Sequence, residues 1–521
     1  MPLYPIEKTV DVIIIGSGAG GAPLASRLAK AGLKVVVLEA GPRWNANTDF
    51  ATDERSQTKL FWKHERISEG QDPTAFGSNN SGSGVGGSTL HYTAYTPRPQ
   101  PDDLRLHSEF GLGNDWPLSF ETLEPYMEEV EQFLGISGPS PYPWGPKRNK
   151  AYSLPPLPLN GPAQLMQRGC EKLGITTSPA ANAALSGPLY IPGVGWRPAC
   201  TNRGYCQAGC STGAKASMDV TFLPMALKHG AEIRPDAFVL ELEKADDGSL
   251  CAVRYLQHSR IIRQRTGFVF LSAGGIESPR LLMLNKLANS SGQVGRNFMA
   301  HPGPELWGIF DEDVRPNKGI PGGLISEDMH RAGADFAGGY LLQSIGVMPV
   351  TYASQLVRGK KLWGRSLGEH MKSYNSVAGI NILGDCLPYA GNGMTLSKEL
   401  DDLGLPKPVI SFSYGENERR MIKHAIKTMT SIWESAGATS LWSFQRSAHT
   451  IGMCRMGEDA ANSVVSSRCQ SHDIPNLFIV DNSVFPSALS VNPALTIMSL
   501  SLYCAASFLA DQGCSSLEVE Q

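Results

Sequence analysis

The 521-residue chain has little cysteine and no concentrated positive charge. Its ten cysteines are too few for a disulfide-stabilised scaffold. The formal net charge is −3 and no Lys/Arg-rich tract or arm occurs, which argues against a nucleic-acid partner. The 41% apolar and 18% charged content is typical of a globular protein with a large core. This length predicts more than one domain.

Long apolar runs are also missing. The first eleven residues, MPLYPIEKTVD, contain no apolar h-region, so the sequence predicts no signal peptide. The longest uncharged apolar run, Thr496 to Ala510, has 15 residues, fewer than the roughly 20 that span a bilayer. We therefore expect a buried helix there, no transmembrane segment and a cytoplasmic location. Export together with a signal-bearing partner would leave no trace in this sequence.

A nucleotide-binding pattern begins near the start of the chain. Val12 to Ile15 predicts a buried parallel strand, and Gly16, Gly18 and Gly21 follow in G-x-G-x-x-G spacing. In this spacing the first glycine permits a tight turn and the second lets a pyrophosphate approach the backbone. The third lets the following helix pack closely on the strand.

The residues that follow complete this pattern. Ala22 to Ala31 predicts a helix, and Val35 to Leu38 predicts a second buried strand that ends at Glu39. An acidic residue at this place accepts hydrogen bonds from the hydroxyls of an adenosine ribose and repels a 2′-phosphate. The strand, glycines, helix, strand and acid together predict a dinucleotide site that does not take an NADP-type ligand.

A second glycine-rich stretch runs from Gly77 to Tyr95. Its backbone, at Gly86, Gly87 and Ser88, is expected to pass close to a flat or anionic ligand, and His91 follows. The alternative is a flexible surface loop. The apolar residues that flank the stretch favour the first interpretation.

Two later segments return to the strand–turn–helix pattern. The sequence FVFLSAGGIESPRLLM predicts a second strand–turn–helix that begins at Gly274, with N–H groups that point at a ligand beside Ala273. Ala231 to Leu242 predicts a strand that brings Val239 near an adenine. Leu477 to Val480 predicts another buried strand, with Asp481 at its end.

Three of the cysteines are clustered. Cys200, Cys206 and Cys210 occur in C-x5-C-x3-C spacing in a glycine-rich loop. Clustered thiolates suit an iron–sulfur cluster or a soft metal. The alternatives are three buried packing thiols, or a zinc-like site that lacks its fourth ligand.

The middle of the chain has a different character. Alternating patterns in Ser373 to Leu383 and Val409 to Tyr414 predict an antiparallel sheet with one covered face. The expected fold class is α/β, with a Rossmann-like dinucleotide-binding domain and a second α+β substrate domain built on that sheet. Residues 1–100, 195–307 and 446–521 are expected to form the first domain, and residues 101–194 and 308–445 the second with its connecting segments.

Four motifs carry a resemblance to a known family. The chain resembles the glucose–methanol–choline (GMC) flavin oxidoreductases through GSGAGG with Glu39, GVGGSTLHY, AGGIESPRLL, and the C-terminal pair HTIGMCRMG and VNPALT, in this order. It is most similar to the sugar and gluconate dehydrogenase large subunits, which share a DWPLSFETLEPY-type stretch and a cysteine cluster. The resemblance implies FAD, a two-domain architecture and oxidation of an alcohol carbon.

Two residues match the catalytic positions of that family. His449 opens HTIGMCRMG, and Asn492 in SVNPALT stands where the family places a second His or an Asn. Histidine suits removal of a hydroxyl proton near neutral pH, and an amide suits holding the substrate oxygen. The alternatives without a catalytic role are a histidine that only packs in the structure and an ordinary Asn-Pro turn. The resemblance implies hydride transfer to flavin N5, and Pro493 predicts that Asn492 is a helix N-cap.

The resemblance bears on two further positions. Some family members attach FAD covalently through a histidine at the spacing of His91, whereas in others this residue packs against the flavin. The related subunits carry an iron–sulfur cluster in a segment like that of Cys200, Cys206 and Cys210, and three cysteines fit a 3Fe–4S cluster. Electrons then pass from FAD to a haem subunit or a quinone. The prolines common around the related cluster are absent here.

The predicted function is FAD-dependent oxidation of a CH–OH group of a sugar, glycoside or polyol. Its partners are a small-molecule substrate and, if the cluster is present, a small or cytochrome electron-transfer subunit. The alternatives are an oxygen-using oxidase of a non-sugar alcohol and a flavin-binding subunit with only an electron-transfer role.

Overall fold

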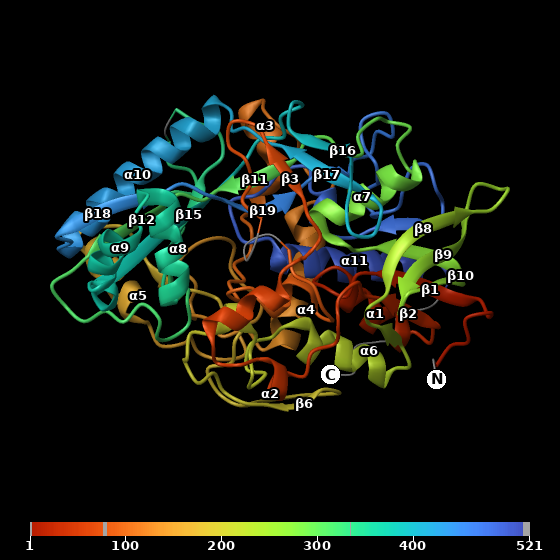
Figure 1. Cartoon of the computed structure of the whole chain (residues 1–521), viewed down its shortest axis with the longest axis horizontal. Helices are drawn as coiled ribbons and strands as arrows, with labels where there is room; N and C mark the ends of the chain where they lie inside the picture. The colour runs from red at the N-terminus through yellow and green to blue at the C-terminus, as the bar shows by residue number, and fades with distance from the viewer. Residues whose placement is uncertain (1–2, 77–80, 334, 514–521) are drawn as a thin grey trace.

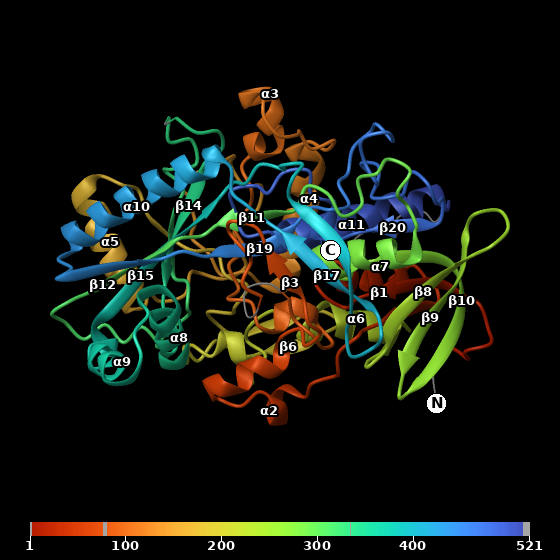
Figure 2. The same ribbon diagram turned by 45° about the horizontal axis from the view of Figure 1, so that its top comes forward.

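The computed structural model describes residues 3–76, 81–333 and 335–513. Part of the predicted second glycine-rich stretch, residues 77–80, lies outside the described residues. Two sheets lie at opposite ends of the long axis of the molecule, as Figure 1 shows: β1 and β8 to β10 at one end, β12, β15 and β18 at the other. Figure 2 shows the same separation after rotation.

The first sheet has seven strands drawn from three parts of the chain. Its order is β7-β2-β1-β10-β9-β8, and β20 also pairs with β10. The pairs β7–β2, β2–β1, β1–β10 and β10–β20 are parallel. The strands are β1 (Val10–Ile15), β2 (Val35–Leu38), β7 (Glu232–Arg234), β8 (Phe238–Lys244), β9 (Leu250–Gln257), β10 (Arg260–Leu271) and β20 (Leu477–Ile479).

The long strand β10 belongs to two pairings. Its first half forms an antiparallel hairpin with β9, and its second half pairs in parallel with β1. The single strand expected over Ala231 to Leu242 is instead two strands, β7 and β8. Pro235 interrupts the ladder and Asp236 has a φ of 53°, so the chain turns there. β7 joins the parallel part of the sheet, and β8 pairs with β9.

Helices pack against this sheet and against one another. α1 (Gly21–Lys30) contacts α6 (Phe222–Lys228) and α11 (Ala494–Asp511), and α4 (Phe120–Leu134) contacts α11. In the described part of the chain, α11 alone is long and apolar enough to cross a membrane, and most of it is buried inside the molecule. The domain boundaries stay a prediction, and α4, from the segment assigned to the second domain, shares the core of the first sheet.

The second sheet is antiparallel and has the order β18-β12-β15-β14-β13-β4. One face is covered by α5 (Gly161–Leu173) and α10 (Glu416–Ala436). Its strands are β4 (Ser178–Pro179), β12 (Glu305–Ile309), β13 (Leu324–Ser326), β14 (Tyr340–Ile345), β15 (Val377–Gly384) and β18 (Ser440–Phe444).

The expectation that only one face of this sheet is covered is wrong. Every residue of β15 is buried. On the face opposite α5 and α10, Trp307 and Val377 pack against Tyr352 of α8 (Pro349–Lys360). An aromatic cluster therefore covers the second face.

A short two-stranded ladder lies between the two sheets. β11 (Met299–Pro302) pairs with β19 (Ser447–Ile451) in antiparallel register. Figure 1 shows both strands near the centre of the molecule. The remaining elements are α2 (Ala46–Asp49), α3 (Leu106–Phe110), α7 (Gly274–Asn285), α9 (Gly364–Met371), β3 (Ile67–Glu69), β5 (Leu189–Ile191), β6 (Gly195–Arg197), β16 (Gly393–Leu400) and β17 (Pro406–Ser411).

Candidate active site

The first glycine loop is shaped by close backbone approaches. Gly16 has a φ of +98°, and a Cβ there would lie 2.3 Å from the carbonyl oxygen of Ser272. A Cβ on Gly21 would lie 1.9 Å from the oxygen of Gly16, so only glycine lets α1 start this close to β1. Gly18 faces the second glycine loop, where a Cβ on Gly87 would lie 2.7 Å from the Gly18 Cα. The two loops are therefore in backbone contact.

The second glycine loop is ordered against the first one. Gly86 has a φ of +117° and donates its N–H to the Ser17 hydroxyl at 3.0 Å. The turn Gly87–Leu90 follows it. Within the part of this stretch that the structure describes, the loop is fixed by these contacts, which favours the ligand-site interpretation over the flexible-loop alternative.

Glu39 holds both loops together. One carboxylate oxygen accepts from the Ser17 N–H at 3.1 Å and the Ser17 hydroxyl at 2.6 Å. The other accepts from the N–H groups of Gly41 at 2.9 Å and Gly84 at 3.3 Å. Burial raises the pKa of Glu39, and these hydrogen bonds oppose that rise. The ribose role of Glu39 stays a prediction, because its oxygens already order the loops.

Asp481, just after β20, has a role similar to that of Glu39 after β2. Its carboxylate accepts from the Gly274 N–H at 2.8 Å, the Ser278 hydroxyl at 2.5 Å and the Ser483 N–H at 2.8 Å. Burial raises its pKa, and the hydrogen bonds oppose that rise. It thereby connects the end of β20 to the start of α7, next to Ala273.

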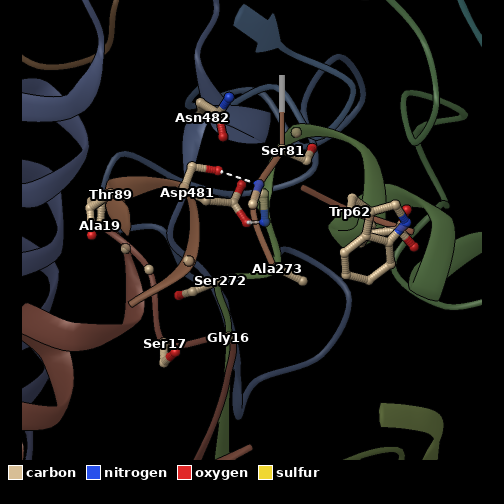
Figure 3. Close-up of a pocket in the computed structure, with 18 of the residues that line it drawn as sticks. Gly16, Ser17, Ala19, Trp62, Ser81, Thr89, Ser272, Ala273, Asp481 and Asn482 are labelled. Atoms are coloured by element: carbon tan, nitrogen blue, oxygen red, sulfur yellow. Dashed lines mark hydrogen bonds between the residues drawn. The ribbon is translucent and has the colours of Figure 1, made fainter. Parts of the chain in front are cut away.

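One cavity runs along all of these segments. Figure 3 shows labelled residues from four separate parts of the chain around it, with Gly16, Ser17 and Ala19 from the first loop and Asp481 and Asn482 from the C-terminal part. Most of the predicted site residues line it: Gly16, Gly18, Glu39, Gly87, Ser88, His91, Val239, Ala273, His449, Asp481 and Asn492. Gly21 and Gly86 are not among the lining residues and act by shaping the loops.

Sequence reasoning missed one wall of the cavity. Trp62, Arg66 and Ser81 line it, although the stretch that contains the first two showed no pattern. The guanidinium of Arg66 pairs with the Glu277 carboxylate at 2.9 Å and donates to the Ser81 hydroxyl at 2.8 Å. Only the position of Ser81 in the second glycine stretch could have signalled its role. Figure 3 shows Trp62 apart from the glycine loops.

A β-bulge directs the side chain of His449 to this cavity. His301 of β11 pairs with Ala448, and Met299 pairs with Ile451, so β19 carries one extra residue in this interval. His449 adopts a φ of 63° within the bulge. Bulges next to active sites commonly re-aim a side chain in this way. Burial, His301 and Arg446 hold the pKa of His449 well below its ordinary value, so the ring is neutral near pH 7.

Asn492 lies beside the start of α11. The helix N-cap is Pro493, so Asn492 precedes the cap position that the sequence suggested for it. The amide of Gln343, on β14, donates to the Asn492 Oδ1 at 2.6 Å. This hydrogen bond leaves the NH₂ group of Asn492 as the donor available to a ligand. The second sheet thus sets the orientation of an amide in the cavity.

The three clustered cysteines do not line this cavity, although Gln207 of the same loop does. Among the described residues, only one group of three or more His, Cys, Asp or Glu side chains has all its ligand atoms within 4.8 Å of one another, and it consists of His64, Asp401 and Asp402. The three thiols are therefore not spaced for a single ion, which disfavours the zinc-like alternative. They are near enough that Cys200 and Cys210 each contribute to the pKa of Cys206, which burial raises to about 12.

Lys215, which sequence reasoning missed, joins the cysteine loop to the second glycine loop. Its buried ammonium group donates to the carbonyl oxygens of Leu90 at 2.8 Å, Tyr92 at 3.2 Å and Cys206 at 2.7 Å. Burial lowers its pKa. Burial also disfavours the Cys210 thiolate, but hydrogen bonds from Thr212 and the Lys215 amide, with the Lys215 charge, hold the pKa of Cys210 below its usual value.

The class of this protein follows from the two glycine loops and from the match of the chain to known domain families. The glycines of the two loops have no side chains, so a pyrophosphate could approach the backbone there. Residues 11–52 match the family model described as FAD binding domain. The chain is an FAD-dependent oxidoreductase, and residues 68–303 and 388–501 match models described as GMC oxidoreductase. It belongs to the GMC oxidoreductase family, as the motifs predicted.

Curated relatives and solved structures agree with this assignment. The fructose dehydrogenase large subunit of Gluconobacter japonicus is 30% identical over 96% of this chain and 98% of its own length. The 2-methyl-1,2-propanediol dehydrogenase of Mycolicibacterium austroafricanum is 29% identical over 94% of each chain. A formate oxidase structure from Aspergillus oryzae has a TM-score of 0.71 at 14% identity and covers 98% of this chain and 100% of its own, which shows the shared fold.

Proposed function

We propose that the protein oxidises a CH–OH group of a sugar, glycoside or polyol to a carbonyl. The observation that carries the proposal is that His449 and Asn492 line the same cavity as the glycine loops of the FAD site. The relatives support the substrate class, because one is named a fructose dehydrogenase and another acts on a diol.

Each residue has a separate task in this reaction. When bound, FAD supplies the acceptor for the hydride that leaves the substrate carbon. The neutral ring of His449 takes the hydroxyl proton, since its lowered pKa keeps it unprotonated near pH 7. Asn492 donates its free N–H to the substrate oxygen and keeps the C–H bond in position.

Replacement of His449 tests the proposed base. We expect His449→Ala to keep bound FAD and to reduce it with substrate about 10²- to 10⁴-fold more slowly, the usual contribution of a positioned base. Anaerobic stopped-flow absorbance measures this rate. His424→Ala is the matched control, because His424 hydrogen-bonds Tyr340 and does not line the cavity. Wild-type flavin reduction in the His449 variant would contradict the assignment.

The substrate class is tested by anaerobic flavin bleaching. Ketoses, aldoses, glycosides, polyols and simple alcohols are each added to the oxidised protein. Sugars or polyols should bleach the flavin fastest. Bleaching only by non-sugar alcohols, with peroxide formed on reaction with oxygen, would favour the oxidase alternative. Absence of bleaching by every CH–OH compound would favour the electron-transfer subunit.

An electron-transfer partner and a cluster form a second part of the proposal. The fructose dehydrogenase relative is named a large subunit, which supports a partner that takes electrons from this chain. Cys200, Cys206 and Cys210 would hold a 3Fe–4S cluster, and Lys215 connects their loop to the cavity loop that contains His91. Iron and sulfide analysis of purified protein tests this. An iron-free, fully active protein would leave the thiols as packing residues.

The histidine at position 91 poses a separate chemical question. His91 lines the cavity, so a covalent link to the flavin is compatible with its place in the structure. Denaturation in acid separates the alternatives: colour that stays with the chain indicates a tether, and colour that is released indicates packing contact alone.

A further inference from the structure

A second histidine lies directly behind His449. His301 is fully buried on β11, and its Nδ1 is 2.9 Å from the Nδ1 of His449. The two rings are nearly perpendicular, at 85°, with centroids 5.0 Å apart. One nitrogen of this pair must donate and the other must accept. The direction of the hydrogen bond therefore decides which nitrogen of His449 carries its proton.

The backbone fixes the proton on His301. Its Nε2 lies 3.0 Å from the carbonyl oxygen of Ala488 and 3.1 Å from that of Leu489. Carbonyl oxygens only accept, so this Nε2 must carry hydrogen. Leu489 has a φ of 68°, and this turn is part of the backbone that presents the two carbonyls to His301.

The charge state of His301 completes the argument. Burial lowers the pKa of His301 to about 4, although the carbonyl hydrogen bonds oppose the change. At neutral pH the ring has a single ring proton, on Nε2, and its Nδ1 can only accept. The Nδ1 of His449 must then be the donor, which leaves the Nε2 of His449 with a free lone pair.

We infer that His301 is a positioning residue that sets the tautomer of His449, so that Nε2 of His449 is the atom that takes the substrate proton. This inference rests on the proposed function. His301 resembles the orienting member of a catalytic triad, but it is neutral. When His449 becomes an imidazolium, the lone pair of His301 still accepts its Nδ1 proton. The charge of Arg446, which pairs with Glu305, disfavours the imidazolium of His449.

Two substitutions at His301 separate orientation from packing. His301→Leu fills the space but offers no acceptor to His449, so the ring can occupy either tautomer. His301→Gln restores both functions on one side chain, because its amide oxygen can accept from His449 and its NH₂ group can donate to the backbone carbonyls. We expect flavin reduction to fall about 10- to 100-fold in the leucine variant, as for other partners that orient a histidine. The glutamine variant should recover most of that loss.

The direct readout is the protonation of His449 itself. ¹⁵N NMR of holoenzyme labelled at histidine reports the tautomer, and the His449→Gln spectrum identifies its signals. Wild type should show a proton on Nδ1 and none on Nε2. His301→Leu should show a mixture, and His424→Leu, the matched control, should match wild type. A proton on Nε2 in wild type, or an unchanged tautomer in His301→Leu, would overturn the inference.

The two proposals fail in different ways. If His449→Ala reduces flavin at the wild-type rate, the assignment of His449 as the base fails, while the NMR spectra still show whether His301 sets the tautomer of His449. If His301→Leu does not fold, as judged by circular dichroism, the wild-type spectrum and the glutamine variant still decide: Nε2–H in wild type, or a tautomer in His301→Gln opposite to wild type, rejects the inference, and Nδ1–H in both supports it.

Discussion

At the scale of single residues, the candidate site combines strain with hydrogen-bond control. His449 has a left-handed φ of 63°, which costs a residue with a Cβ on the order of 1–2 kcal/mol. The bulge in β19 and the hydrogen bond to His301 hold it there. Such conformations tend to occur where function requires them. Gln343 fixes Asn492 through a shorter contact, at 2.6 Å.

The lowered pKa of His449 predicts a specific pH dependence. Its ring must be neutral to accept a proton, so activity is lost only as the pH falls through its pKa. Because burial, His301 and Arg446 hold that pKa well below 6.5, we expect a constant rate of flavin reduction from pH 8 down to pH 6.5. Stopped-flow measurements across this range check it. If the rate of flavin reduction instead fell with a midpoint at or above pH 6.5, the FAD-bound enzyme would not keep the ring of His449 neutral.

At the scale of elements, the turn from β1 to α1 depends on glycine for two reasons. Gly16 has a φ of +98°, and a Cβ would lie 2.3 Å from the Ser272 carbonyl oxygen on the neighbouring turn. Gly32, after α1, has a similar φ of +89° but open space around it. The two positions therefore separate backbone strain from steric exclusion.

Alanine at these two glycines should have unequal effects. We expect Gly32→Ala to cost about 1–2 kcal/mol, the price of a left-handed alanine, and to keep bound FAD. Gly16→Ala should cost more and lose most of the FAD, since the Ser272 turn must move away from the cavity. The flavin-to-protein absorbance ratio and the Tm measure both effects. If both variants lost equal amounts of FAD and of stability, backbone strain alone would explain why position 16 requires glycine.

At the scale of the whole molecule, the site is assembled from distant segments. His301 and His449 are 148 residues apart, and Gln343 and Asn492 are 149 apart. The β11–β19 ladder brings the first pair together between the two sheets. The orientation of His449 and Asn492 in the cavity thus depends on contacts with segments far away in the chain.

One buried carboxyl group should make that stability depend on pH. Asp385 is buried, and one of its oxygens accepts from the Cys386 N–H at 2.8 Å. The other has no hydrogen-bond partner among the described residues. Burial and the nearby Asp103 raise the pKa of Asp385 to about 7. The folded state then holds a proton that the unfolded chain releases near pH 4.

The sign of the effect follows from this difference in proton binding. The stability contributed by protonated Asp385 is present below about pH 4 and is lost as the pH rises through about 7, by up to about 4 kcal/mol. We expect Asp385→Asn to raise the free energy of unfolding at pH 8 and to flatten its change between pH 5 and 8. Denaturant unfolding measures this, with Asp311→Asn, at an exposed site, as the control. An unchanged pH profile would contradict it.

Part of the site could be predicted from sequence because its chemistry is local. Gly16, Gly18 and Glu39 belong to one strand–turn–helix–strand unit, whose spacing alone predicts the cradle. The family motifs likewise identified His449 and Asn492, and the structure places both in the cavity. The fold class and the family were also predicted correctly, because the strands, turns and family motifs are short continuous stretches that occur in the expected order along the chain.

The rest was decided only by tertiary structure. His301 and Gln343 stand in segments without any motif, and they contact His449 and Asn492 from 148 and 149 residues away. Lys215 follows the cysteine cluster, but its hydrogen bond to Leu90 spans 125 residues. The covered second face of β15 depends on where α8 packs, and the break between β7 and β8 depends on which sheet each strand joins. The local sequence determines which turns form and which side-chain groups are present at each position. Which group receives each hydrogen bond, and so which nitrogen of His449 is free, is decided by the packing of distant strands.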